Sequence, residues 1–291
     1  MLRSFQVGIE VRKHGINWNE ISISEIKQTP EKSVWLVQLE GKSRFIFKQF
    51  GSGEHDLQHY QTELSALQGI SPSGLVPTIE FYEESTRIIC TEHMGAYVDG
   101  FSPSSGISDI HLNYEIDRNR FQPHFGLPGV LSWFASRPNG LNYLQQSIVD
   151  RVLDSVSLRY CAESVLDEWS EVTLIHGDMK NPHVFHVGGA YRFCDWEYSQ
   201  FGRIEWDLAG LAHEEVVKAL DEKTFRQLNP NVFARYCRLR STDVRLLQKM
   251  TALRLAQTAV EMLSGSDSLS RRSIETLMAS ELLASRPLLA G

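Results

Sequence analysis

Two short segments decide the fold of this chain: LIHGDMK, residues 174–180, and FCDWE, residues 193–197. Each begins with an apolar run and leads directly into an acidic residue, Asp178 in the first segment and Asp195 in the second. Short apolar runs bounded by polar loops are typical of buried strands. The pattern therefore predicts two carboxylates, each in a loop at the end of a strand, that face one cleft.

Two carboxylates in one cleft fit the needs of phosphoryl transfer. One of them accepts the proton of the attacking hydroxyl group or orients the nucleophile, and the other holds Mg²⁺ on the nucleotide phosphates. Each acid taken alone has a second explanation, because Asp is common in loops for the hydrogen bonds it makes to its own backbone. The pair together favours the catalytic interpretation.

Upstream, the stretch FIFKQF, residues 45–50, places Lys48 inside a hydrophobic strand. A lysine in such a position must find a partner or lose its charge. The apolar spacing over residues 54–68 predicts a helix, and Glu63 on this helix is the candidate partner. Two alternatives stay open: Lys48 reaches solvent from an edge strand, and Glu63 is a solvated helix position.

The chain divides into two parts with different patterns. The first ninety or so residues hold short β-branched and aromatic segments around one helix, with EGK at 40–42 as a hairpin turn, which predicts a small antiparallel sheet. Beyond Gly95 amphipathic helices dominate. We therefore expect an α+β protein with an N-terminal lobe, residues 1–94, and a mainly helical C-terminal lobe, residues 95–291. The expected strands are 33–39, 43–50, 76–82 and 86–92, and the clearest later helices are 154–169, 207–221, 244–263 and 273–285.

The composition argues against several classes of protein. With 291 residues, 42% of them hydrophobic, the chain can bury a core, and no stretch approaches the roughly eighteen apolar residues of a membrane span. The four cysteines are too far apart for a zinc knuckle. A net charge of −7 without a basic patch argues against a nucleic-acid partner. We expect a soluble, cytoplasmic protein with no membrane or nucleic-acid partner.

Three ordered motifs resemble those of a known family. HGD at 176–178, DWE at 195–197 and WDLA at 206–209 are similar to the catalytic, metal-binding and helix-anchoring motifs of the aminoglycoside phosphotransferase and choline kinase-like branch of the protein-kinase fold. The resemblance spans residues 33 to about 212. It implies a two-lobed protein-kinase-like fold with ATP and Mg²⁺ as cofactors, with Mn²⁺ as an alternative metal.

For catalysis, the resemblance implies that Asp178 is the base and that His176 orients the catalytic loop. Asp207 would tie this loop to its helix, and capping of the helix start is a second, compatible explanation. Lys180 follows the base by two residues, where the lysine of Ser/Thr protein kinases offsets charge on the transferred phosphoryl group. A solvent-exposed lysine is the alternative.

For the nucleotide, the resemblance implies that Lys48 contacts the α- and β-phosphates and that Glu63 holds Lys48. The stretch RIICTEHM, residues 87–94, resembles the strand and hinge that join the two lobes. Backbone groups from Glu92 to Met94 should therefore hydrogen-bond the adenine.

The turn that would cover the phosphates, QTPEKS at 28–33, contains no glycine. This excludes the Gly-rich loop of protein kinases, which the antibiotic-kinase branch commonly lacks too, and we assign a phosphate contact to Ser33. The sequence departs from the family pattern at the metal site. The resemblance makes Asp195 a metal ligand, and the family places the asparagine of the second metal site five residues after the base. Here that position is His183, and Asn181 stands two residues earlier. Either the imidazole of His183 replaces the amide as a metal ligand, or the loop is rearranged and Asn181 supplies the ligand.

Three functions follow from these motifs. The first is transfer of the γ-phosphate of ATP to a hydroxyl group of a small molecule, such as an antibiotic, a sugar or an aminoalcohol. The second is phosphorylation of Ser or Thr in a precursor peptide, because the motifs with Lys180 are also similar to kinase-like proteins of bacterial peptide-modification pathways. The third is a pseudokinase that binds a nucleotide or partner without turnover.

The stretch HEE at 213–215 is interpreted as solvated surface.

Overall fold

The computed structural model describes residues 21–29, 31–39, 44–95, 121, 126–171, 173–225, 242–264 and 268–285. These residues form two compact units. The first unit combines residues up to 95 with residue 121 and residues 182–198. The second unit holds residues 126–181 and everything described from 199 onward.

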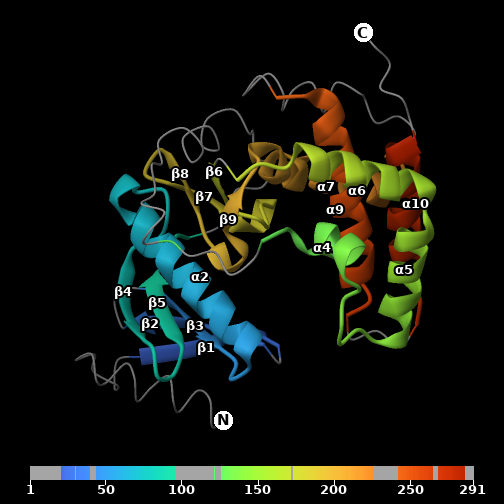
Figure 1. Ribbon diagram of the computed structural model, residues 1–291. Coiled ribbons are helices and arrows are strands. Elements are labelled where there is room, and N and C mark those ends of the chain that lie inside the picture. Colours follow the sequence, from blue (N-terminus) through green and yellow to red (C-terminus); the bar gives the residue numbers. More distant parts are fainter. Residues whose placement is uncertain are drawn as a thin grey trace. The chain divides into compact units, whose positions relative to one another are not determined.

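The first unit contains an antiparallel sheet of five strands in the order β1-β2-β3-β5-β4 (Figure 1). The strands β2 to β5 confirm the predicted sheet, and the hairpin turn at 40–42 lies outside the described residues. The first strand, β1, was not predicted because its side chains are mostly exposed and carry no clear apolar pattern. The strands are β1 (Ile21–Gln28), β2 (Lys32–Leu39), β3 (Arg44–Phe50), β4 (Ile79–Glu83) and β5 (Ile88–Glu92).

The two faces of this sheet differ in chemistry. One face carries a buried apolar cluster made of Trp35, Val37, Phe47, Ile88 and Cys90. Because side chains alternate along a strand, the residues next in line, Lys32, Val34 and Lys48, lie on the opposite face. Val34 and Lys48 are also paired in the register of β2 and β3. The sheet therefore places two lysines on one face and the core on the other.

The helix α2 (Glu54–Ile70) contacts β3 and β5. It begins after Gly53, whose N–H group donates to the carboxylate of Asp56 at 3.0 Å. The expected apolar stripe is confirmed, since Tyr60, Leu64 and Leu67 are buried. Glu63 is 5% exposed on the same face, which excludes a solvated position for this carboxylate.

A second hairpin belongs to the first unit, although it begins more than ninety residues after the end of β5. It pairs β7 (Val184–Val187) with β8 (Ala190–Phe193), and the N–H of Phe193 donates to the carbonyl of Leu75 at 2.8 Å. The short helix η4 (Trp196–Tyr198) follows and contacts α2. Asp195, between β8 and η4, has a positive φ of 67°, a conformation that Asp adopts more readily than most residues. The FCDWE segment is therefore part of the unit that holds the sheet.

The second unit is mainly helical and includes one short strand pair, β6 with β9. Figure 1 shows α9 among the other helices, and α9 contacts α10, α7, α6, α5 and α4. Almost every residue in the middle of α9 is buried. The elements are α4 (Gly129–Ala135), α5 (Tyr143–Asp154), α6 (Val156–Glu168), β6 (Thr173–Ile175), β9 (Gln200–Gly202), α7 (Ile204–Asp221), α9 (Val244–Glu261) and α10 (Arg271–Ser285).

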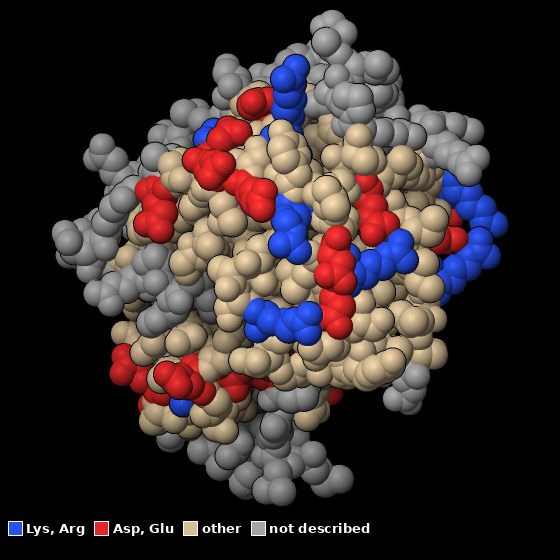
Figure 2. Space-filling view, turned by 45° about the vertical axis from the view of Figure 1, so that its right-hand side comes forward, with Lys and Arg blue, Asp and Glu red and all other residues tan. Residues whose placement is uncertain are grey.

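Charged side chains of both signs lie next to each other on the face shown in Figure 2. The ion pairs of α10 follow this pattern, with Arg271 next to Glu275 and Arg272 next to Asp221. Such exposed pairs contribute little to stability. Among the described helices, none has the length and apolar character needed to cross a membrane.

Candidate active site

A cluster of two lysines and three carboxylates lies within the first unit: Lys32 on β2, Lys48 on β3, Glu63 on α2, and Asp195 and Glu197 after β8. The Nζ atom of Lys48 is 2.5 Å from Glu63 and 2.8 Å from Glu197, and it also contacts Asp195. The Nζ atom of Lys32 is 2.5 Å from Glu197 and 3.3 Å from Asp195. Lys48 is therefore a buried, paired lysine and not one that reaches solvent from an edge strand.

The cluster controls the charge of its members. Burial disfavours the ammonium form, but the carboxylates of Asp195, Glu197 and Glu63 raise the pKa of Lys48 well above its usual value. Burial opposes ionisation of Asp195 as well, but Lys48 and Lys32 lower the pKa of this carboxyl well below its usual value. For Glu63, burial outweighs the nearby lysine and raises the pKa of the carboxyl group. Lys48 and Asp195 are consequently both charged at neutral pH.

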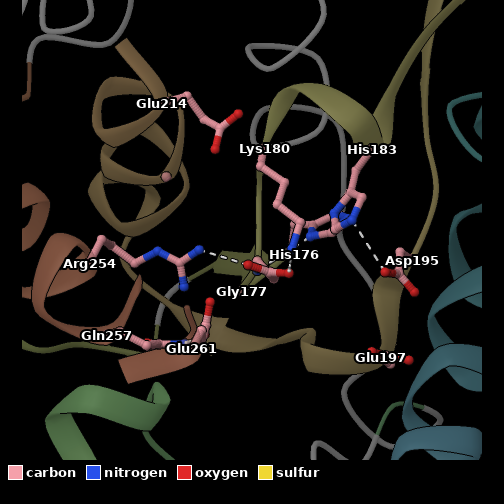
Figure 3. A network of polar contacts seen from close by, with 12 residues as sticks. His176, Gly177, Lys180, His183, Asp195, Glu197, Glu214, Arg254, Gln257 and Glu261 are labelled. Atoms are coloured by element: carbon pink, nitrogen blue, oxygen red, sulfur yellow. Dashed lines mark hydrogen bonds and ion pairs between the residues drawn. The ribbon is translucent and has the colours of Figure 1, made fainter. Parts of the chain in front are cut away.

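His183 lies beside the same carboxylate. Its Nε2 atom is 3.2 Å from Oδ2 of Asp195 (Figure 3). The two lysines contact the other oxygen, Oδ1. His183 ends the short helix η3 (Asn181–His183) and is buried. Its carbonyl oxygen accepts a hydrogen bond from the N–H of Cys194 at 3.0 Å, so the backbone holds the two segments together.

A cavity of about 450 Å³ opens next to this cluster, inside the first unit. Its apolar wall includes Val34, Ile46, Ile89 and Phe185, and its polar groups come from the lysine and carboxylate cluster. Sites for small molecules commonly combine an apolar wall with a few placed polar groups. The cavity therefore has the composition of a site for a small molecule.

The predicted hinge residues line this cavity. The N–H of Glu92 donates to Thr78 and the N–H of His93 donates to Arg44, both at 3.0 Å, so these two donors serve the sheet. The N–H of Met94 has no such role among the hydrogen bonds of the described residues, and Met94 borders the cavity. Of these three hinge residues, Met94 is thus the one whose N–H does not bond the sheet among the described residues.

The structure places Ser33 away from the cavity. Ser33 is buried on the sheet face that carries Trp35, because alternate residues of a strand share a face. Lys32 is the residue of this segment that lines the cavity. An ammonium group therefore stands where the sequence predicted a hydroxyl.

The HGD loop lies in the second unit and is anchored to α7. The carboxylate of Asp207 accepts hydrogen bonds from the N–H of His176 at 2.8 Å and from the N–H of Gly177 at 3.0 Å. The indole N–H of Trp206 donates to the carbonyl of Gly177 at 2.9 Å. The capping explanation for Asp207 is wrong, because α7 begins at Ile204, three residues earlier than expected. Asp207 is a buried anchor of the loop.

Close packing of α7 against the loop also requires a glycine. A Cβ atom built on Gly210 would lie 2.2 Å from the carbonyl oxygen of Met179, closer than real Cβ contacts come. Gly210 thus lets the helix approach the backbone of the loop directly.

Asp178 lies between two cations. Its Oδ2 atom is 2.6 Å from Nζ of Lys180, and its Oδ1 atom is 2.7 Å from Nη2 of Arg254 on α9. In Figure 3, Lys180 belongs to this loop itself, whereas Arg254 reaches it from α9. The N–H of Asp178 donates to Nδ1 of His176 at 3.4 Å, which ties the imidazole to the loop. The Lys180 side chain is 32% exposed, so it is an ion-pair partner of Asp178 and not a free surface lysine.

Three residues of these sites were not predicted as functional: Lys32, Glu197 and Arg254. Glu197 stands inside the DWE motif, so the motif itself was a signal. Arg254 is a lone charge in the apolar middle of a helix, which is also a readable signal. The interpretation of HEE as solvated surface was wrong for His213, which is 4% exposed and hydrogen-bonds the carbonyl of Gly210 through Nδ1.

These features define a protein-kinase-like fold, as the motifs predicted. No protein-family model matches the chain, and no curated protein matches it. Choline kinase LicA from Streptococcus pneumoniae aligns with a TM-score of 0.67 and 12% identity over 98% of this chain and 99% of its own. An ethanolamine kinase from Plasmodium vivax aligns with a TM-score of 0.63 and 15% identity over 95% and 85%. A thermostable mutant of aminoglycoside phosphotransferase APH(4)-Ia aligns with a TM-score of 0.58 and 14% identity over 94% and 97%.

At such identities the likeness establishes the fold. The similar structures are kinases of the branch that the sequence motifs resemble. Among them are LicA in complex with AMP and the APH(4)-Ia mutant in a ternary complex with ADP and hygromycin B.

Proposed function

We propose that this chain is an ATP-dependent phosphotransferase that moves the γ-phosphoryl group to a hydroxyl group of a small molecule. One observation carries the proposal: Lys48 is buried in contact with Glu63 and Asp195 at the edge of an apolar cavity. Replacing buried ion pairs by apolar side chains is often neutral or stabilising, so the stability of the fold alone does not account for this cluster. Binding of nucleotide phosphates next to an aromatic base would account for it.

The nucleotide site is assigned to the first unit and thus mainly to residues 1–94. The adenine ring would lie against the apolar wall and accept a hydrogen bond from the N–H of Met94. The ammonium group of Lys48 would contact the α- and β-phosphates, with Glu63 holding the lysine in place. Lys32 lines the same cavity and supplies a second positive charge near the phosphates.

Two of the carboxylates also fit a divalent metal ion. Asp195 and Glu197 can each offer one oxygen, in a group whose ligand atoms lie within 4.8 Å of one another, while Glu63 of that group is assigned to Lys48. Carboxylate oxygens are the hard ligands that Mg²⁺ prefers, and His183 adds a nitrogen beside Asp195. When bound, Mg²⁺ would neutralise charge on the phosphates.

Asp178 is assigned as the general base. Its carboxylate would accept the proton of the acceptor hydroxyl while that oxygen forms a bond to the γ-phosphorus and the bond to ADP breaks. Asp207 and Trp206 hold the loop through backbone contacts, so the carboxylate starts from a fixed position. Lys180 would offset charge on the transferred group.

A small-molecule acceptor is supported by the similar structures. They are kinases named for choline, ethanolamine and aminoglycosides, which are small molecules. We further propose that the enzyme is soluble and acts in the cytoplasm, where ATP is available. A peptide acceptor and a pseudokinase are retained as outcomes of the test below.

The test is to incubate the purified chain with ATP and Mg²⁺ and with aminoalcohols, sugars, aminoglycosides or Ser/Thr peptides. Mass spectrometry should detect the gain of one phosphate on a small molecule, together with ADP. Phosphorylated peptide with inert small molecules would replace the proposal by the peptide kinase, and ATP binding without any product would indicate a pseudokinase.

The matched variant is Asp178→Asn. Asparagine is preferable to alanine because it still accepts a hydrogen bond from the buried Arg254. Turnover should fall by roughly 10²–10⁴-fold, the usual worth of a positioned base, while ATP affinity stays the same. Full turnover in this variant would remove Asp178 from the chemistry.

A further inference from the structure

We propose that Arg254 is a positioning residue that holds the Asp178 carboxylate in place for phosphoryl transfer. This inference rests on the proposed function. The guanidinium group contacts the carboxylate directly, with 2.7 Å between Nη2 of Arg254 and Oδ1 of Asp178.

The place of Arg254 in the fold is unusual for an arginine. Arg254 is 4% exposed, and its neighbours Leu253, Leu255 and Ala256 on α9 are fully buried. Burying a guanidinium group costs free energy unless a partner compensates it, so an apolar side chain would suit the packing of this helix better. The ion pair with Asp178 is the contact that explains a cation here.

Arg254 also contacts Trp206, which hydrogen-bonds the backbone of the loop. Its guanidinium carbon lies 5.6 Å from the ring centroid of Trp206, within the range of a cation–π interaction. The indole of Trp206 donates to the carbonyl of Gly177, the residue before Asp178. One tryptophan therefore supports both the backbone of the loop and the group that orients its carboxylate.

The two oxygens of Asp178 have different partners. Oδ1 is held by Arg254, a buried side chain from a helix that contacts five others. Oδ2 contacts Lys180, which lies in the same loop and is partly exposed. We assign the proton of the acceptor hydroxyl to Oδ2, because Lys180 can turn away from it while Arg254 keeps the carboxylate from rotating.

The planar guanidinium group suits this role better than an ammonium group. It cannot lose its proton in a protein, and its donors lie in a fixed plane. Burial acts against its charge, but the carboxylates of Asp178 and Glu261 raise the pKa of Arg254 above its usual value. Arg254 is thus charged at neutral pH.

The test compares Arg254→Lys and Arg254→Gln with Arg245→Gln, a matched control at an exposed position of the same helix. Steady-state kinetics with an accepted substrate should show kcat reduced by about 10–100-fold in both Arg254 variants, the scale expected for a misplaced catalytic group. The KM for ATP should not change, because the ATP contacts come from other elements. Arg245→Gln should retain wild-type kinetics.

Chemical rescue separates positioning from folding. Added guanidinium at millimolar concentration should raise the kcat of Arg254→Ala and leave Arg245→Ala unchanged. Unchanged kcat in folded Arg254 variants would overturn the inference, as would a rise in the KM for ATP alone. Loss of cooperative unfolding in all three Arg254 variants would also overturn it, by making Arg254 a residue of the fold only. A wild-type protein that phosphorylates no acceptor would instead overturn the proposed function and, with it, this inference.

Discussion

His183 and Asp195 are joined by a contact of 3.2 Å between Nε2 and Oδ2, while the other oxygen of Asp195 faces the two lysines. The carboxylate therefore has a nitrogen on one oxygen and ammonium groups on the other. The family pattern that the motifs resemble places an asparagine at the position of His183, five residues after the proposed base. This contact is therefore where the proposed metal site would differ from that pattern.

The His183 contact leads to a prediction about metal choice. Imidazole suits softer ions than Mg²⁺, so the wild-type enzyme should use Mn²⁺ comparatively well. His183→Asn should shift the preference toward Mg²⁺, measured as turnover against the concentration of each metal. An unchanged preference would mean that His183 only hydrogen-bonds Asp195.

The contact between Lys48 and Glu63 predicts coupled losses in ATP affinity. Lys48→Met removes a charge aimed at the phosphates, and Glu63→Gln should weaken binding less. The double variant should deviate from additivity by about 0.5–3 kcal/mol, because the two side chains touch. Calorimetric titration with ATP measures the affinity of the wild type, the two single variants and the double variant. Lys218→Met, at an exposed position of α7, is the control. Additive losses would show that the pair does not act as a unit.

Asp207 should contribute to the stability of the folded protein. Asp207→Asn keeps the shape but removes the charge that two backbone N–H groups contact, so the free energy of unfolding should drop by about 1–3 kcal/mol. Urea unfolding measures this change. Asp221→Asn on the same helix breaks only an exposed pair with Arg272 and should cost less than about 1 kcal/mol. Equal losses in the two variants would argue against the buried anchor.

The buried position of His213 predicts that the folded protein loses stability at acidic pH. Burial, and then the charge of Arg254, lower the pKa of His213 to about 3. Between that value and the ordinary pKa of about 6.5, the unfolded chain binds a proton that the folded chain does not, so stability falls as the pH is lowered through about 6.5. From pH 7.5 to 5.5 this residue alone should cost about 1.4 kcal/mol.

The His213→Gln variant tests this acid sensitivity. Denaturant unfolding at the two pH values should show a smaller loss in His213→Gln than in the wild type. His186→Gln is the control, since His186 is exposed. A pH dependence identical in wild type and His213→Gln would show that folding does not lower the pKa of His213.

Local patterns predicted much of the fold. The strands β2 and β3 and the helix α2 alternate or repeat their apolar residues clearly, so their positions followed from the sequence. The strand β1 is exposed and lacks such a pattern, and α7 begins before the acid that suggested its start. Sequence reasoning finds elements that bury one face and misses those that do not.

The residues of the candidate sites also fall into those that the sequence could predict and those that it could not. Asp178, Asp195 and Asp207 stand in motifs that are contiguous in the chain, so they could be named. Arg254 follows Asp178 by 76 residues, and only the packing of α9 brings it to the loop. Lys32 was missed for another reason: the choice between Lys32 and Ser33 depends on which face of β2 points to the cavity, and that was decided by the register with β3.

The absent side chain of Gly210 has a consequence for how this protein tolerates mutation. Because α7 touches the backbone carbonyl of Met179 at this point, any larger residue must push the helix and the loop apart. A saturation library at position 210 would therefore lose abundance and catalysis together, whereas at Asp178 the two would separate. At position 210, variants selected only for high abundance should therefore also keep the catalytic loop in place.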